Sequence, residues 1–239
     1  MKRAILTVAL SLVFVVCQTA NATADTYNKA YDKAATYGKP TKGIVLHLHG
    51  CRELRITESW LVGWRDLLVQ NGYKVVAPDS FDDSRPEHMC PSNEWRTLED
   101  ILEVFEIRSK QTSHAIEQIK KSHPDKKLFV WGYSEGAFIA NRVTENVDGV
   151  VTTGGVCQDL RVDVPPDVPL LVIIGGDDEA IDRYLRRKDG KYDSMEDLCQ
   201  RTMASENREW LIVGDMGHEA PLAFSKVKTA IAKFFDIQN

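Results

Sequence analysis

One short stretch constrains the fold more than any other: an apolar run that ends in a serine between two glycines. Leu128 to Trp131 can form a buried strand, and it leads directly into Gly132-Tyr133-Ser134-Glu135-Gly136. Beyond this motif, Phe138, Ile139 and Val143 can share one face of a helix. The stretch therefore predicts a strand, a tight turn and a helix, with the serine in strained backbone geometry at the turn.

A serine held in such a turn stands exposed above a sheet, where it can act as a nucleophile. The helix behind it directs its unpaired backbone N–H groups and its positive dipole end at the reacting group. We assign one oxyanion donor to the amide of Glu135. The alternative is an ordinary glycine-rich turn, because patterns of five residues recur by chance.

The length of the chain favours one domain behind a cleaved leader. A chain of 239 residues with 43% hydrophobic content can bury one core and is short for two. Residues 1–24 resemble a secretory signal peptide, with a basic start, an apolar run from Ala4 to Val16, and cleavage expected after Ala22 or Ala24. We expect residues 25–239 to form the mature domain, either in the periplasm or secreted.

Charge and hydropathy disfavour several kinds of partner. The apolar run of the leader is shorter than the roughly 20 residues that a membrane-spanning helix needs, so we expect no stable membrane anchor after cleavage. Loss of Lys2 and Arg3 changes the formal net charge from −5 to −7. A negative chain is a poor match for nucleic acid or an anionic membrane surface. The sequence makes no prediction of the oligomeric state.

Export to an oxidising compartment makes the remaining cysteines candidates for disulfides. None of them has Cys-x-x-Cys spacing, which disfavours metal binding. Three pairings are possible, and we favour Cys51–Cys90 and Cys157–Cys199, because each pair is expected in loops on the rim of the site. Free buried thiols are the alternative.

Apolar runs alternate with helical patterns along the chain. Strands are expected at residues 43–49, 73–77, 128–131, 149–153, 168–174 and 208–213, and helices at 58–71, 97–122, 180–187 and 220–237. Residues 79–95 are expected to form a long loop, those from 187 to about 206 a charged insertion, and 25–37 a short helix or a mobile arm. Because most strands are apolar on both faces, we predict a three-layer α/β fold, with a mostly parallel sheet of about six strands.

Two polar residues follow later strands of this sheet, where ligands of such sheets bind. Asp178 comes after the strand at 168–174 and His218 after the strand at 208–213. A serine needs a base to take its proton and a carboxylate to orient that base, so we predict that Ser134, His218 and Asp178 act together. Asp177 occupies the same turn and is the alternative carboxylate.

The loop after the first expected strand holds His49-Gly50-Cys51, and we assign the second oxyanion donor to the amide of Cys51. His47 and His49 point to the same side of a strand and could be metal ligands. No further ligand follows at close spacing, so we expect neither a metal nor a cofactor.

Together, these motifs resemble the α/β-hydrolase superfamily over nearly all of the mature length. Within it, the chain looks most like the dienelactone-hydrolase-related group, through His49-Gly50-Cys51, Trp64, Gly72-Tyr73, Pro78-Asp79-Ser80-Phe81, Arg85 and Cys90. It departs from the dienelactone hydrolases proper in having a serine where their nucleophile is cysteine. No strand is expected before residue 43.

The resemblance implies hydrolysis of a carboxylic ester through an acyl-serine intermediate. It also implies that Arg52, Asp79, Phe81 and Arg85 line the mouth of the site, with Arg85 either holding a substrate carboxylate or solvated. The absence of a long apolar lid favours small, fairly polar substrates. Other functions stay open: a peptidase or amidase with the same residues, a metal-dependent hydrolase, or a catalytically silent binding protein on this scaffold.

Overall fold

The computed structural model describes residues 29–52, 54, 59–81, 97–144, 146–155, 157, 162–179, 194–203, 207–219 and 224–237. The predicted leader, most of the predicted loop at 79–95 and the predicted helix at 180–187 lie outside these residues. Among the described helices, none combines the length and the apolar character needed to cross a membrane.

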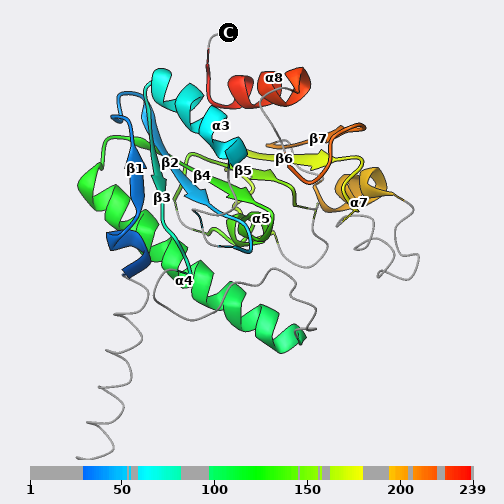
Figure 1. Ribbon diagram of the computed structural model, residues 1–239, viewed down its shortest axis with the longest axis horizontal. Helices are drawn as coiled ribbons and strands as arrows, with labels where there is room; N and C mark the ends of the chain where they lie inside the picture. The colour runs from blue at the N-terminus through cyan, green and yellow to red at the C-terminus, as the bar shows by residue number, and fades with distance from the viewer. Residues whose placement is uncertain are drawn as a thin grey trace, which may run out of the picture.

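The centre of the molecule is a seven-stranded sheet in the order β1-β3-β2-β4-β5-β6-β7 (Figure 1). The strands are β1 (Ala35–Tyr37), β2 (Gly43–Leu48), β3 (Tyr73–Ala77), β4 (Lys127–Tyr133), β5 (Gly149–Thr153), β6 (Leu170–Gly175) and β7 (Arg208–Val213). All neighbouring pairs from β3 to β7 are parallel. The prediction of a mostly parallel sheet is confirmed, and each strand after the first lies where the sequence predicted one.

The strand that the sequence analysis missed is β1, which pairs antiparallel with β3 at the edge of the sheet. Residues 29–32 are helical, in agreement with one of the two alternatives for 25–37, but the three residues of β1 are too few to show an alternating pattern. Gly38 follows it with φ of 77°, and the Arg65 guanidinium lies 4.6 Å from the Tyr37 ring. The expectation of no strand before residue 43 was therefore wrong.

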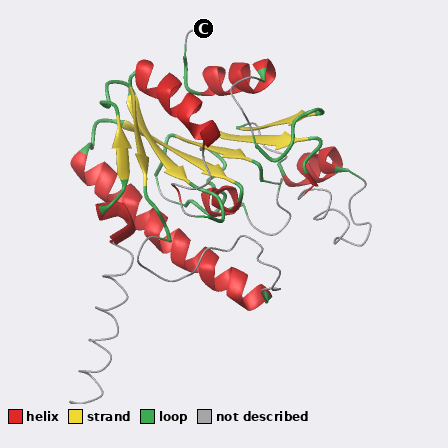
Figure 2. Cartoon of the chain, viewed as in Figure 1, coloured by secondary structure: helices red, strands yellow, loops and turns green. Residues whose placement is uncertain are grey.

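Helices cover both faces of the sheet (Figure 2). One face packs against α4 (Leu98–Ser122), α5 (Glu135–Ala140) and α7 (Met195–Thr202) through a core that includes Leu46, Val130 and Ile119. The other face packs against α3 (Ser59–Gln70) and α8 (Ser225–Phe234) around Trp64 and Trp131. Successive residues of the inner strands alternate between the two cores, so nearly every position of β2 to β6 is buried, whereas the edge strands β1 and β7 are mostly exposed or partly exposed.

The predicted start of the long helix is confirmed in detail. Thr97 accepts a hydrogen bond from the Asp100 amide, and the Asp100 carboxylate accepts one from the Thr97 amide, which forms a capping box. In contrast, α7 lies inside the insertion for which no helix was predicted. Its apolar residues Met195, Leu198 and Cys199 have helical spacing, but they cover little more than one turn within a charged segment, so the helix was not predicted.

Candidate active site

Ser134 occupies the junction between β4 and α5, in a backbone conformation that side chains rarely adopt. Its φ is 52° and its ψ is −117°. The Ser134 N–H donates to the carbonyl of Thr153 at 2.9 Å, which ties the strained residue to the neighbouring strand β5. Strain held in place by surrounding structure is typical of functional positions.

The two glycines of the motif are required by close backbone contacts. A Cβ at Gly132 would lie 2.2 Å from the carbonyl oxygen of Gly136. A Cβ at Gly136 would lie 2.1 Å from the carbonyl oxygen of Leu48 in β2. Any larger residue at either position would push the helix away from the strands and so move Ser134.

Three side chains that are distant in sequence form one chain of hydrogen bonds. His218 Nε2 lies 2.8 Å from Ser134 Oγ, and His218 Nδ1 lies 2.6 Å from Asp178 Oδ2. Asp178 is buried, whereas Asp177 is exposed and its amide donates to the Met216 carbonyl. The geometry thus favours Asp178 over Asp177 as the partner of the imidazole.

Glycines also set the position of the loop that carries His218. A Cβ at Gly154 would lie 2.6 Å from the His218 carbonyl oxygen. The Tyr133 ring packs against the imidazole, with 5.4 Å between ring centroids. The backbone of His218 is therefore held close to the end of β5, and its ring contacts the residue before Ser134.

The loop after β2 lies directly over the serine. A Cβ at Gly50 would lie 3.4 Å from Ser134 Cβ, and Cys51 follows it as a disulfide-bonded residue. Glu135 is the first residue of α5, next to Ser134. The structure therefore brings the two segments that hold the predicted oxyanion donors to the same side chain.

Comparisons with known proteins address the fold. No protein-family model matches the chain, and no curated protein sequence matches it. Among solved structures, TT1662 from Thermus thermophilus is 16% identical, with a TM-score of 0.62 over 87% of this chain and 100% of that one. Esterase PE8 is 17% identical, with a TM-score of 0.58 over 86% and 98%. Dienelactone hydrolase from Anabaena variabilis is 17% identical, with a TM-score of 0.54 over 85% and 90%.

The chain has the α/β-hydrolase fold. On this scaffold, the serine follows the central strand β4, and Asp178 and His218 follow β6 and β7. All three come from the carboxyl ends of parallel strands, where the sequence analysis expected them.

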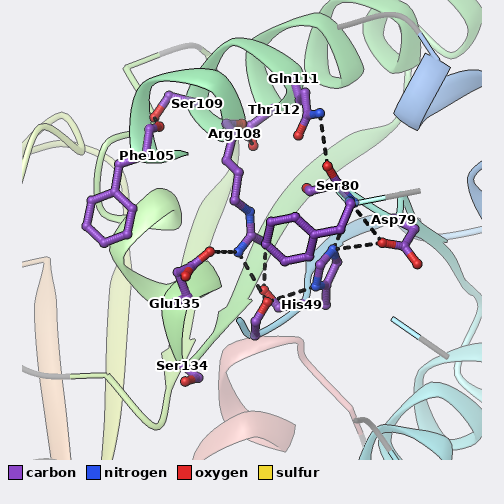
Figure 3. A network of polar contacts seen from close by, with 12 residues as sticks. His49, Asp79, Ser80, Phe105, Arg108, Ser109, Gln111, Thr112, Ser134 and Glu135 are labelled. Carbon is purple, nitrogen blue, oxygen red and sulfur yellow. Dashed lines mark hydrogen bonds and ion pairs between the residues drawn. The ribbon is translucent and has the colours of Figure 1, made fainter. Parts of the chain in front are cut away.

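Arg108 of α4 is a buried charged residue near this site that the sequence analysis missed (Figure 3). It is 1% exposed and donates to the carbonyls of His49 and Gly50 and to the Glu135 carboxylate. A signal was present, because Arg108 falls on the helical stripe of Val104, Ala115 and Ile119 that packs into the core. A charged residue at a core position of an α/β-hydrolase helix is informative, since it is rarely buried without a partner.

His49 is not arranged as a metal ligand. Its Nε2 accepts from the Ser80 N–H at 2.9 Å, and its Nδ1 lies 2.9 Å from the Gly50 carbonyl, so the neutral ring carries its proton on Nδ1. Complete burial, with the nearby Arg108 charge, holds the pKa of His49 well below its usual range. No cluster of three or more potential metal ligands occurs within the described ranges.

The predicted substrate-binding residues lie in different environments. The Asp79 carboxylate accepts from the amides of Leu54 and Phe81, so it supports the loop next to the site. Phe81 is 8% exposed, and its ring contacts the His49 ring edge-on and lies 5.2 Å from the Arg108 guanidinium. Arg52 is exposed, and Arg85 lies outside the described residues.

The predicted Cys157–Cys199 disulfide is confirmed, with an S–S distance of 2.09 Å. Cys157 lies beyond the carboxyl end of β5, as expected, but Cys199 lies within the helix α7 and not in a loop. Both residues are fully buried in the α/β-hydrolase core. The predicted Cys51–Cys90 pairing involves Cys90, which lies outside the described residues.

Proposed function

We propose that the protein is an exported serine hydrolase that cleaves small carboxylic esters through an acyl-serine intermediate. The observation that carries the proposal is the hydrogen-bonded chain Ser134–His218–Asp178, which begins at a serine with strained backbone geometry. A nucleophile, its base and an orienting carboxylate in this order are the groups that acyl transfer needs.

In the acylation step, Ser134 Oγ attacks the ester carbonyl carbon and its proton passes to His218 Nε2. Asp178 holds the imidazole through Nδ1 and stabilises its positive form. The carbonyl oxygen becomes an oxyanion, which accepts hydrogen bonds from the amides of Glu135 and Cys51. His218 then donates the proton to the departing alkoxide oxygen as the carbon–oxygen bond breaks.

Deacylation repeats these steps with water in place of Ser134. His218 takes a proton from water, the resulting hydroxide adds to the acyl carbon, and the same amides hold the second oxyanion. The bond to Ser134 Oγ breaks, and His218 returns the proton to that oxygen. Apart from the ester and water, this cycle uses only the chain's own residues.

Three observations support a polar ester substrate and an exported location. Two of the similar structures are named as an esterase and a dienelactone hydrolase, and both share the α/β-hydrolase fold. The buried Cys157–Cys199 disulfide fits an oxidising compartment and agrees with the leader predicted at residues 1–24. The exposed Arg52 follows Cys51 directly and is available to polar groups of a substrate.

The test expresses the full chain with its own leader and assays the exported product. We expect hydrolysis of short p-nitrophenyl esters, a steep decline with longer acyl chains, and little cleavage of peptide anilides. A fluorophosphonate should label Ser134 alone, and Ser134→Ala should lose both labelling and turnover. Faster cleavage of anilides than of esters would identify an amidase, and an unlabelled wild-type chain without turnover would identify a binding protein.

A further inference from the structure

The guanidinium of Arg108 is buried among three oxygen atoms of two separate segments. Its Nη2 donates to the His49 carbonyl at 2.6 Å, and its Nη1 donates to the Gly50 carbonyl at 3.2 Å and to Glu135 Oε1 at 2.5 Å. The first two oxygens belong to the loop after β2, and the third belongs to the residue after Ser134 (Figure 3). One nitrogen therefore joins both segments that hold the proposed oxyanion donors.

We propose that Arg108 is a positioning residue that sets the oxyanion hole, by fixing the peptide unit between Gly50 and Cys51 and linking it to Glu135. The inference rests on the proposed hydrolase function. Arg108 lies on the helix α4 and acts only through the atoms that it holds.

The planarity of the peptide bond connects these contacts to the site. In a trans peptide, the carbonyl of one residue and the N–H of the next point in opposite directions. Arg108 and His49, both buried, bind the carbonyl of Gly50 from the interior. The N–H of Cys51 is thereby turned away from the interior, on a loop whose Gly50 lies over Ser134.

His49 reinforces the same orientation from a second direction. Because its Nε2 accepts from the Ser80 amide, its proton lies on Nδ1 and is donated to the Gly50 carbonyl. Two donors on one carbonyl leave the peptide little freedom to rotate. A peptide that rotates would present a carbonyl oxygen, not an N–H, to the developing negative charge.

Arginine suits this position better than lysine. Its planar fork reaches the carbonyls of His49 and Gly50 with two nitrogens, while its charge balances the buried Glu135 carboxylate. A lysine supplies one nitrogen, so it can neutralise Glu135 but cannot hold both carbonyls in the same geometry.

The experiment compares two variants of the exported full chain. Arg108→Lys keeps the charge beside Glu135, and the double variant Arg108→Met/Glu135→Leu removes both buried charges together, so neither is left unpaired. Loss of one oxyanion donor typically lowers kcat by about 100-fold or more. We expect a decrease of roughly this size in the double variant and about 10-fold in Arg108→Lys, with KM changed less than about threefold in both.

A trifluoromethyl ketone separates a positioning role from a structural one. Ser134 adds to its carbonyl and forms a tetrahedral oxyanion, so the inhibitor constant should rise by the same factor as kcat/KM falls. The midpoints of the pH–rate profile should not shift, because Arg108 contacts His49, Gly50 and Glu135 and not His218 or Asp178. The end-point stoichiometry of fluorophosphonate labelling reports the fraction of folded sites.

The matched control is Arg142→Met. The guanidinium of Arg142 lies over the ring of Phe105, which is on α4, the helix that also carries Arg108. We expect this variant to keep wild-type kcat and inhibitor affinity. If the double variant labels fully and retains wild-type kcat, Arg108 does not position the oxyanion hole and the hydrolase function still stands. If the wild-type chain neither labels nor turns over esters, the proposed function itself fails.

Discussion

Gly175 and Gly217 lie in direct backbone contact: a Cβ at Gly175 would come within 2.0 Å of the Gly217 carbonyl oxygen. The contact joins the end of β6 to the residue before His218. The position of the His218 imidazole therefore depends on the lack of a side chain at Gly175 in β6, although His218 itself follows β7.

We expect Gly175→Ala to displace His218 and to lower kcat by about 100-fold, since displacements of about 1 Å in an active site can cost that much. Ester turnover and a crystal structure of the variant would measure both effects. The control is Gly214→Ala, where a Cβ meets no described atom within 4 Å. Equal activity of the two variants would contradict the prediction.

The two neighbouring aspartates should differ sharply. Asp178→Asn removes the charge that stabilises protonated His218 and should lower kcat by about 10⁴-fold. Asp177→Asn changes an exposed side chain in the same turn and should stay within about threefold of the wild type. Steady-state ester hydrolysis distinguishes them, and a larger loss in Asp177→Asn would reverse the assignment.

The Cys157–Cys199 disulfide should contribute strongly to stability, because it closes a long stretch of chain. For a sequence separation of 42 residues, the entropy removed from the unfolded chain corresponds to about 4 kcal/mol. The double variant Cys157→Ala/Cys199→Ala should lose about this much in urea unfolding. Substitution is preferable to reduction, which would also open the disulfide of Cys51.

Burial of neutral His49 predicts a loss of stability in mild acid. Because its folded pKa is lowered, the unfolded chain binds a proton more readily. Its contribution is complete above the unfolded pKa of about 6.5 and is lost as the pH falls from there towards the folded value. Arg108 and His47 repel a protonated His49 ring. The Asp79 carboxylate, whose Oδ1 lies 3.6 Å from His49 Nε2, would attract it.

Urea unfolding between pH 7.5 and pH 5 measures this dependence. We expect the free energy of unfolding to fall more steeply with acid in the wild type than in His49→Gln. His114→Gln is the control, since His114 is only partly buried on the surface of α4. A slope that is unchanged in His49→Gln would show that other groups govern the acid sensitivity.

Much of the fold could be predicted from local patterns. The parallel strands are short apolar runs buried on both faces, and the start of α4 carries a capping box that is visible in the sequence. The edge strand β1 was missed because three residues show no usable period. The helix α7 was missed because its helical pattern, Met195, Leu198 and Cys199, is only about one turn long in a charged segment.

The sequence allowed prediction of those site residues that lie in a short motif directly after a strand. Ser134, Asp178 and His218 each follow a predicted strand, and the structure brings them together, although their catalytic roles stay predictions. Arg108 was not found, because its importance comes from carbonyls 58 and 59 residues away in the sequence. Its place on the apolar stripe of α4 indicates that it is buried, but nothing local in the sequence identifies the backbone carbonyls that it binds.

The arrangement of the sheet has a further consequence for how activity arises. Ser134 follows the central strand, whereas His218 follows β7, the last of the described strands in chain order and an outermost member of the sheet. In the proposed mechanism, the Ser134 hydroxyl gains its proton acceptor, His218, only when β7 joins the edge of the sheet. Partly assembled molecules would therefore be inert towards esters, and the onset of turnover would report completion of folding.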